Sequence, residues 1–143
     1  MTKVGNVYFL FCSFVDGRAP TEELLLDTKG IVKDKHYNKN IERSVLLASM
    51  QSYALVKKHS INVPYGALGE NLLMDYNPYH LPSGFRLKIG NVILEISQHC
   101  TLCKSLAKVD VKLPKLLKDD RGIFAKVIES GSIKEGDTIY LLD

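Results

Sequence analysis

Residues 85–96, FRLKIGNVILEI, decide the fold class of this chain. Two runs of mainly apolar, β-branched and aromatic residues, 85–89 and 92–96, flank the dipeptide Gly90-Asn91. Two strand-like runs separated by a glycine-containing dipeptide are typical of a β-hairpin. We therefore predict a hairpin here, whose second strand continues toward Ser97.

Further strand-like runs lie on both sides of this hairpin. Apolar runs bounded by turn residues occur at 4–15, 24–26, 72–74, 122–129 and 138–142. Residues 41–58 carry apolar side chains at helical spacing and predict one long helix. Asn40, which directly precedes them, is a suitable N-cap. Residues 113–118 predict a short helix. We expect a mostly β chain with helices (α+β), in which the strands curl into a β-barrel with flanking helices.

Composition and charge limit the class of protein. We expect a single domain over residues 1–143, because 45% hydrophobic residues supply a core without disulfides or a structural metal. The net charge of +3 favours anionic ligands but is too small to predict a nucleic-acid partner. The apolar run at 7–11 is too short for a secretory or membrane segment. We therefore expect a cytoplasmic protein with no membrane association.

A CxxC pair, Cys100 and Cys103, directly follows the hairpin. A strand end holds the backbone while the next loop exposes its side chains, so these thiols are well placed to meet a ligand. Three chemistries use such a pair: thiol–disulfide exchange, zinc binding, and a single thiolate that serves as nucleophile, sulfur carrier or ligand to a soft metal. Zinc is disfavoured because a structural site needs four ligands and no second close pair exists. The alternative is a buried cysteine that acts as a small hydrophobe, which we expect for Cys12.

Two other polar stretches predict parts of a ligand pocket. Lys33, Lys35, His36 and Arg43 form a basic cluster suited to a phosphate or another oxyanion, and a solvated loop is the alternative. The stretch GALGEN, residues 66–71, offers two glycines that let a backbone approach a ligand, followed by a carboxylate and an amide. It is neither a P-loop nor a dinucleotide fingerprint, because the lysine of the first and the third glycine of the second are missing.

Taken in order, these segments resemble the MOSC domain family, named for the C-terminal domain of molybdenum cofactor sulfurases. The resemblance rests on GIVKDKH at 30–36 with RSVLL at 43–47, YGALGENL at 65–72, LKIGNVILEISQ at 87–98, and RGIFAKV at 121–127 with Gly131, Ile133, Gly136 and Asp137. Each motif is weak alone, whereas the ordered set covers nearly the whole chain.

The resemblance implies a β-barrel-like fold and a small-molecule ligand, the molybdenum cofactor, a pterin that bears a dithiolene and a phosphate. By position, Cys103 is the implied catalytic cysteine and metal contact, with Cys100 as a resolving or alternative thiol. Lys33 stands where the family more often has glycine, and Cys100 stands where many relatives carry arginine. The residues implied to bind the cofactor are Lys33, His36, Arg43, Gly69, Glu70, Asn71 and Gln98.

Three functions follow, in this order. The first is a molybdenum-cofactor protein, a small oxidoreductase component that reduces N-hydroxylated or similar substrates with an electron-transfer partner. The second is a non-redox sulfur carrier whose Cys103 accepts a persulfide from a separate cysteine desulfurase, since no pyridoxal phosphate site is visible in this chain. The third is a thiol-redox or zinc-binding accessory protein that needs only Cys100 and Cys103. The first two share residues, and the sequence leaves both open.

Overall fold

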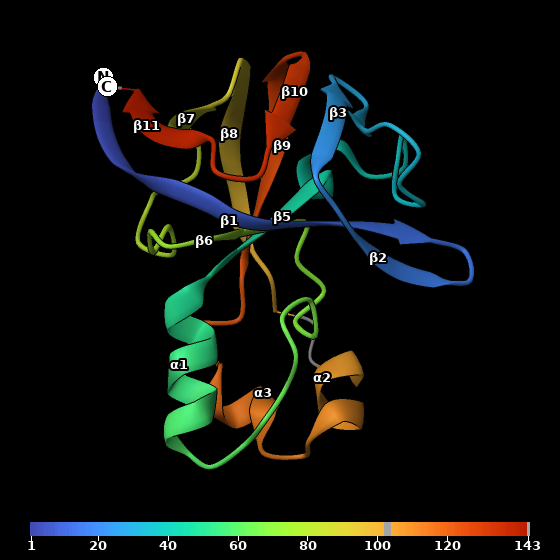
Figure 1. Ribbon diagram of the computed structural model, residues 1–143, viewed down its shortest axis with the longest axis vertical. Helices are drawn as coiled ribbons and strands as arrows, with labels where there is room; N and C mark the ends of the chain where they lie inside the picture. The colour runs from blue at the N-terminus through green and yellow to red at the C-terminus, as the bar shows by residue number, and fades with distance from the viewer. Residues whose placement is uncertain (102–103, 143) are drawn as a thin grey trace.

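The strands form a closed barrel with the helices beneath it, as Figure 1 shows. The computed structural model describes residues 1–101 and 104–142. Within these ranges seven strands close in a ring, because β1 pairs with β6 on one side and with β11 on the other. The ring runs through β11 (Thr138–Leu142), β7 (Arg86–Ile89), β8 (Val92–His99), β9 (Ile123–Glu129), β5 (Val45–Ser49), β6 (Leu72–Met74) and β1 (Thr2–Phe14).

The remaining elements extend or flank this barrel. Strand β2 (Gly17–Thr21) pairs with the second half of β1 and forms a hairpin that projects from the barrel (Figure 1). A smaller sheet has the order β10-β3-β4, from β10 (Gly131–Lys134), β3 (Glu23–Asp27) and β4 (Gly30–Ile31). The helical segments are η1 (Ile41–Arg43), α1 (Met50–Lys58), α2 (Lys104–Val109) and α3 (Leu113–Leu116).

The predicted hairpin is confirmed as β7 and β8, which pair antiparallel with Ile89 opposite Val92 across the Gly90-Asn91 turn. Leu87 and Leu94 face each other in register and are fully buried. Burial of each such leucine contributes about 2 kcal/mol. From Val92 to Ser97, buried residues of β8 alternate with partly exposed ones, which is the period of two that a half-buried strand requires.

The predicted helix over residues 41–58 is wrong in its first half. Residues 45–49 form β5, which pairs parallel with β6 and antiparallel with β9, and all five residues are buried. A strand that is buried on both faces reads as a continuous apolar run, which helical and strand periods fit equally well. Helix α1 starts afterwards, where the Ser49 hydroxyl accepts a hydrogen bond from the Gln51 amide at 3.1 Å. Ser49, not Asn40, is therefore the cap of this helix.

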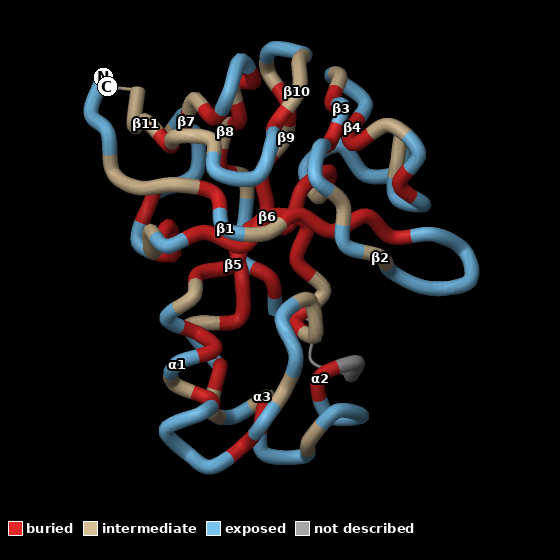
Figure 2. The backbone as a smooth tube through the Cα atoms, in the orientation of Figure 1, coloured by how far each residue is buried: buried red, intermediate tan, exposed pale blue. Residues whose placement is uncertain are grey.

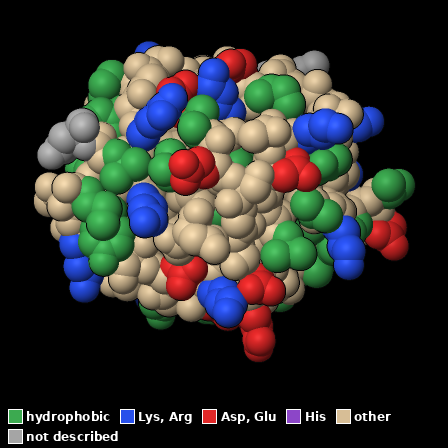
Figure 3. All heavy atoms as spheres, turned by 90° about the horizontal axis from the view of Figure 1, so that it is seen from above, with side chains coloured by type: hydrophobic (Ala, Val, Ile, Leu, Met, Phe, Trp, Pro, Cys, Tyr) green, Lys and Arg blue, Asp and Glu red, His purple; other side chains and the backbone are tan. Residues whose placement is uncertain are grey.

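Two apolar clusters hold the molecule together. The larger cluster fills the barrel, and Figure 2 shows the buried segments crossing where β1, β5 and β6 meet. The smaller cluster joins α1 and α3 to the outside of the barrel through Val56, Leu73 and Leu113. No helix in the described ranges is long and apolar enough to cross a membrane. On the barrel end seen in Figure 3, basic and acidic side chains lie interspersed.

Candidate functional site

A cavity of about 440 Å³ opens where the β1–β2 hairpin meets the loop before β5 and the segments before β6 and β9. Elements far apart in sequence therefore supply its walls. The lining residues are Ser13, Arg18, Lys35, His36, Lys39, Asn40, Arg43, Ser44, Leu46, Gly69, Asn71, Cys100, Arg121 and Phe124.

The cavity is strongly cationic. Five lysine and arginine side chains line it together with His36, and none of the described lining residues is acidic. Several cations around one concave space raise the local concentration of an anion and bind it by charge-assisted hydrogen bonds. Arginines from distant segments, Arg18 and Arg121, thus add to the predicted basic cluster. The barrel end in Figure 3, by contrast, carries both basic and acidic side chains.

A buried carboxylate, Asp34, holds the loop that carries His36. One oxygen, Oδ1, accepts from the His36 backbone amide at 2.9 Å and lies 3.0 Å from His36 Nδ1. The other, Oδ2, accepts from the Ser13 amide at 2.8 Å. Burial opposes ionisation of Asp34, but hydrogen bonds from His36 and Ser13 outweigh it and lower the pKa of the carboxyl. Asp34 therefore orients the imidazole of His36, whose side chain is 56% exposed.

Asn71 ties three segments together beneath the cavity. Its carbonyl oxygen accepts from the Leu46 amide at 3.0 Å, and its amide nitrogen donates to the Phe11 carbonyl at 3.2 Å and to Asp34 Oδ2 at 3.3 Å. Because both the oxygen and the nitrogen of its side-chain amide are hydrogen-bonded within the protein, Asn71 has a structural role in the cavity wall.

Glu70 lies between Gly69 and Asn71, but its carboxyl turns away from the cavity. Oε2 accepts from the Tyr53 hydroxyl at 2.6 Å and from the Gly66 amide at 3.2 Å. Burial raises the pKa of Glu70, and burial beside this carboxyl also raises the pKa of Tyr53. The Glu70 backbone carbonyl accepts a hydrogen bond from Arg18, whose side chain lines the cavity.

Two arginines that sequence reasoning missed complete the site. Arg18 donates to the Ser13 hydroxyl and to the Glu70 carbonyl, and Arg121, which is 6% exposed, donates to the Leu68 carbonyl. Arg121 opens the RGIFAKV stretch, which entered the family resemblance as a motif without a role for its arginine. Arg18 follows a turn glycine, and no local pattern distinguishes it from a surface residue.

The guanidinium groups of Arg43 and Arg121 retain unused hydrogen-bonding capacity. Arg43 lies over the Phe124 ring, 4.7 Å from the ring centroid. The Nε atoms of Arg43 and Arg121 are both buried and have no hydrogen-bond partner among the described residues. Burial of an unpaired charged donor is costly, and both side chains also line the cavity, where a ligand that accepts hydrogen bonds could meet their guanidinium groups.

The cysteines are placed differently. Cys100 is 5% exposed, lines the cavity, packs with Leu46 and Phe124, and donates its backbone N–H to the Gly122 carbonyl at 3.0 Å. Cys103 lies outside the described residues. Cys12 is buried on β1, as expected. No group of three or more His, Cys, Asp or Glu side chains in the described ranges is arranged to hold a metal ion.

Two predicted cofactor residues lie apart from the cavity. Lys33 has a left-handed backbone, with φ of 74°, and lines a separate hollow of about 310 Å³ beside Cys12. Gln98 is exposed on β8, opposite Phe124 in register. The structure therefore gathers His36, Arg43, Gly69, Asn71 and Cys100 around one space.

The structure is that of a small β-barrel protein. A cationic cavity, which Cys100 also lines, opens at the side of its barrel. The chain belongs to the MOSC domain family, whose sequence model matches residues 32–140. This assignment confirms the family resemblance and the barrel fold.

Solved structures share this fold. The YuaD protein from Bacillus subtilis superposes with a TM-score of 0.83 at 16% identity, over 94% of this chain and 93% of that one. YiiM from Escherichia coli gives 0.71 at 16% identity, over 94% of this chain and 69% of that one. YiiM from Geobacillus stearothermophilus gives 0.71 at 15% identity, over 99% and 75%. Comparison with curated proteins gives no match.

Proposed function

We propose that this protein binds the molybdenum cofactor in the cationic cavity, with the phosphate of the pterin held by the arginine and lysine side chains. The observation that carries the proposal is the set of five lysine and arginine side chains around one cavity, with no acidic residue among its described lining residues. Guanidinium groups match the geometry of phosphate oxygens and can bind them through two parallel hydrogen bonds. Membership of a family associated with this cofactor supports the same ligand.

The residues of the cavity fit the parts of such a ligand. Lys35, Arg43 and Arg121 supply donors for the phosphate, while Phe124 and Leu46 supply an apolar wall for a flat ring system. Cys100 supplies a soft thiol in the same cavity, and Cys103 is the other proposed thiol. When bound, the cofactor supplies two-electron redox chemistry at its metal, which suits reduction of N-hydroxylated substrates with electrons from a separate partner. His36, oriented by Asp34, is the side chain placed to exchange a proton at Nε2.

A second function, sulfur carriage, rests on the position of Cys100. Its thiol is buried between Leu46 and Phe124, which would shield a persulfide from other thiols. In the transfer step a cysteine thiolate of this chain attacks the outer sulfur of a persulfide on a separate desulfurase. The donor's sulfur–sulfur bond breaks, its thiolate leaves, and the persulfide forms here. Cys100 and Cys103 are both proposed acceptors.

Anaerobic purification from a host that makes the cofactor separates these functions. We expect wild-type protein to carry pterin and molybdenum, and Arg43→Gln to lose both, while Lys29→Gln, at an exposed loop, retains them. Loss of metal in Cys100→Ser or Cys103→Ser identifies the metal contact. Protein with no pterin under these conditions would contradict cofactor binding, and a mass increase of one sulfur on a cysteine after incubation with a desulfurase would then support carriage.

A further inference from the structure

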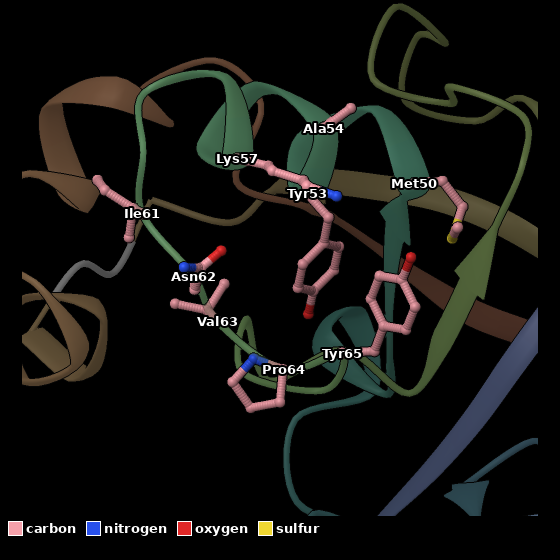
Figure 4. A pocket seen from close by; sticks show the side chains of 9 residues that line it. All are labelled: Met50, Tyr53, Ala54, Lys57, Ile61, Asn62, Val63, Pro64 and Tyr65. Carbon is pink, nitrogen blue, oxygen red and sulfur yellow. The ribbon is translucent and has the colours of Figure 1, made fainter.

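A second cavity, of about 760 Å³, lies between helix α1 and the segment 61–65 (Figure 4). Its described lining residues are all different from those of the cationic cavity. Tyr53 and Tyr65 pack edge to face there, with ring centroids 4.9 Å apart, and Figure 4 shows Val63 and Pro64 beside them. We call this hollow the tyrosine groove.

The aromatic surface continues beyond the groove. The Tyr65 ring contacts Phe9 at 5.6 Å and Tyr8 at 6.3 Å between centroids. Tyr65 is 42% exposed and Tyr8 is 50% exposed, so both of these neighbouring tyrosines are accessible to solvent. Exposed, contiguous aromatic side chains mark protein interaction surfaces, where tyrosine is enriched among residues that dominate binding energy.

The charged side chain in the described lining of the groove is a cation, Lys57. Lys57, Lys58 and His59 are exposed at the C-terminal end of α1, and Lys57 lines the groove. The stretch 50–69, which forms both walls, contains no aspartate or glutamate. Complementary charges direct partner choice at interfaces, so the electrostatic complement of this surface is acidic.

We propose that the tyrosine groove docks an acidic segment of a partner protein, with an apolar side chain of the partner packed against Tyr65 and Pro64 and a carboxylate against Lys57. The groove and the cationic cavity are joined through Tyr53, whose ring lines the groove and whose hydroxyl bonds to Glu70 beneath the cavity. This inference does not depend on which ligand the cationic cavity binds.

The probe is a fluorescein-labelled peptide, Asp-Glu-Leu-Phe-Asp-Glu, followed by fluorescence anisotropy and by ¹⁵N chemical shifts. We expect saturable binding that shifts amides in residues 50–65 and leaves those around Arg43 unmoved. The same peptide with lysine in place of its acids, or serine in place of Leu-Phe, should bind about ten-fold more weakly, since each removes one of the two contacts.

Two charge reversals on exposed lysines provide the matched comparison. Lys57→Glu should weaken the acidic peptide about ten-fold, whereas Lys29→Glu, on the loop between β3 and β4, should leave it unchanged. Equal binding of the acidic and basic peptides, no binding of either, or equal effects of the two variants would overturn the proposal. A wild-type dimer in sedimentation that Lys57→Glu dissociates would assign the groove to a second copy of this chain instead.

Discussion

The Asn71 side-chain amide donates to the Asp34 carboxylate at 3.3 Å, and this contact joins the two polar segments that flank the cavity. Asp34 also fixes the Ser13 backbone amide at 2.8 Å, so one carboxylate connects β1, the basic loop and the segment before β6. The cationic cavity therefore has a frame of neutral and acidic groups behind a lining of cations.

Replacement of Asp34 should destabilise this frame. Asp34→Ala leaves the Ser13 and His36 amides without their acceptor, at a cost of about 3 kcal/mol in the free energy of unfolding. Because the folded state lowers the pKa of Asp34, its contribution is complete above the ordinary value of 3.8 and is lost as pH falls through the folded value. Urea unfolding between pH 7 and pH 3 measures this difference. A cost as small as that of Asp16→Ala, at the exposed tip of the hairpin, would contradict the assigned role.

Glu70 should show the opposite pH dependence. Burial raises its pKa above the ordinary 4.5, so the ionised form destabilises the fold, and stability is lost as pH rises from 4.5 through the folded value. Glu70→Gln removes this ionisation while an amide oxygen still accepts from Tyr53. The variant should therefore gain stability relative to wild type as pH rises, measured by urea unfolding with Glu135→Gln as the exposed control. A difference that stays constant with pH would refute this view of Glu70.

The cationic cavity should bind inorganic phosphate weakly. Phosphate should raise the melting temperature above that in chloride at equal ionic strength, because a ligand that binds only the folded state stabilises it; at 100 times its Kd the gain is about 2.7 kcal/mol. Lys35→Gln and Arg121→Gln should reduce the gain, while Lys29→Gln retains it. An equal gain in all four proteins would show that phosphate acts elsewhere.

Gly66 should tolerate no side chain, because its φ is +93° and an added Cβ would lie 2.9 Å from Cε1 of the Phe11 ring. Gly136 has a similar φ of +86° and no neighbour within 4 Å, so it is the matched control. Gly136→Ala should cost about 1 kcal/mol for backbone strain alone, and Gly66→Ala about 2 kcal/mol more for the clash. Chemical denaturation of the two variants measures the difference, and equal costs would remove the clash from the explanation.

Sequence patterns predicted the strands that have one buried face and one less buried face, because such strands show a regular alternation along the sequence. In the hairpin of β7 and β8, buried residues alternate with exposed or partly exposed ones over residues 86–89 and 92–97, so its strands and its turn were predictable. Strand β5 is buried on every side, and its apolar run could not be distinguished from part of a helix until the pairing with β6 and β9 was known.

The site was predictable where its residues share a local segment. His36 and Arg43 come from one loop and its continuation, and their charges alone indicated an anion site. Arg18 and Arg121 reach the same cavity only through the barrel topology, which no local pattern encodes. The polar sequence GEN predicted three ligand-binding groups, yet the Glu70 carboxyl turns away to accept hydrogen bonds from the Tyr53 hydroxyl and the Gly66 amide.

The proposed ligand of the cationic cavity is a phosphate-bearing pterin. The most direct test compares 6-hydroxymethylpterin phosphate with 6-hydroxymethylpterin by fluorescence titration of the purified protein. We expect the phosphorylated pterin to bind about 100-fold more tightly, because of two charge-assisted hydrogen bonds, and Arg121→Gln to remove most of this preference. Equal affinity for the two pterins in the wild-type protein would contradict the proposal.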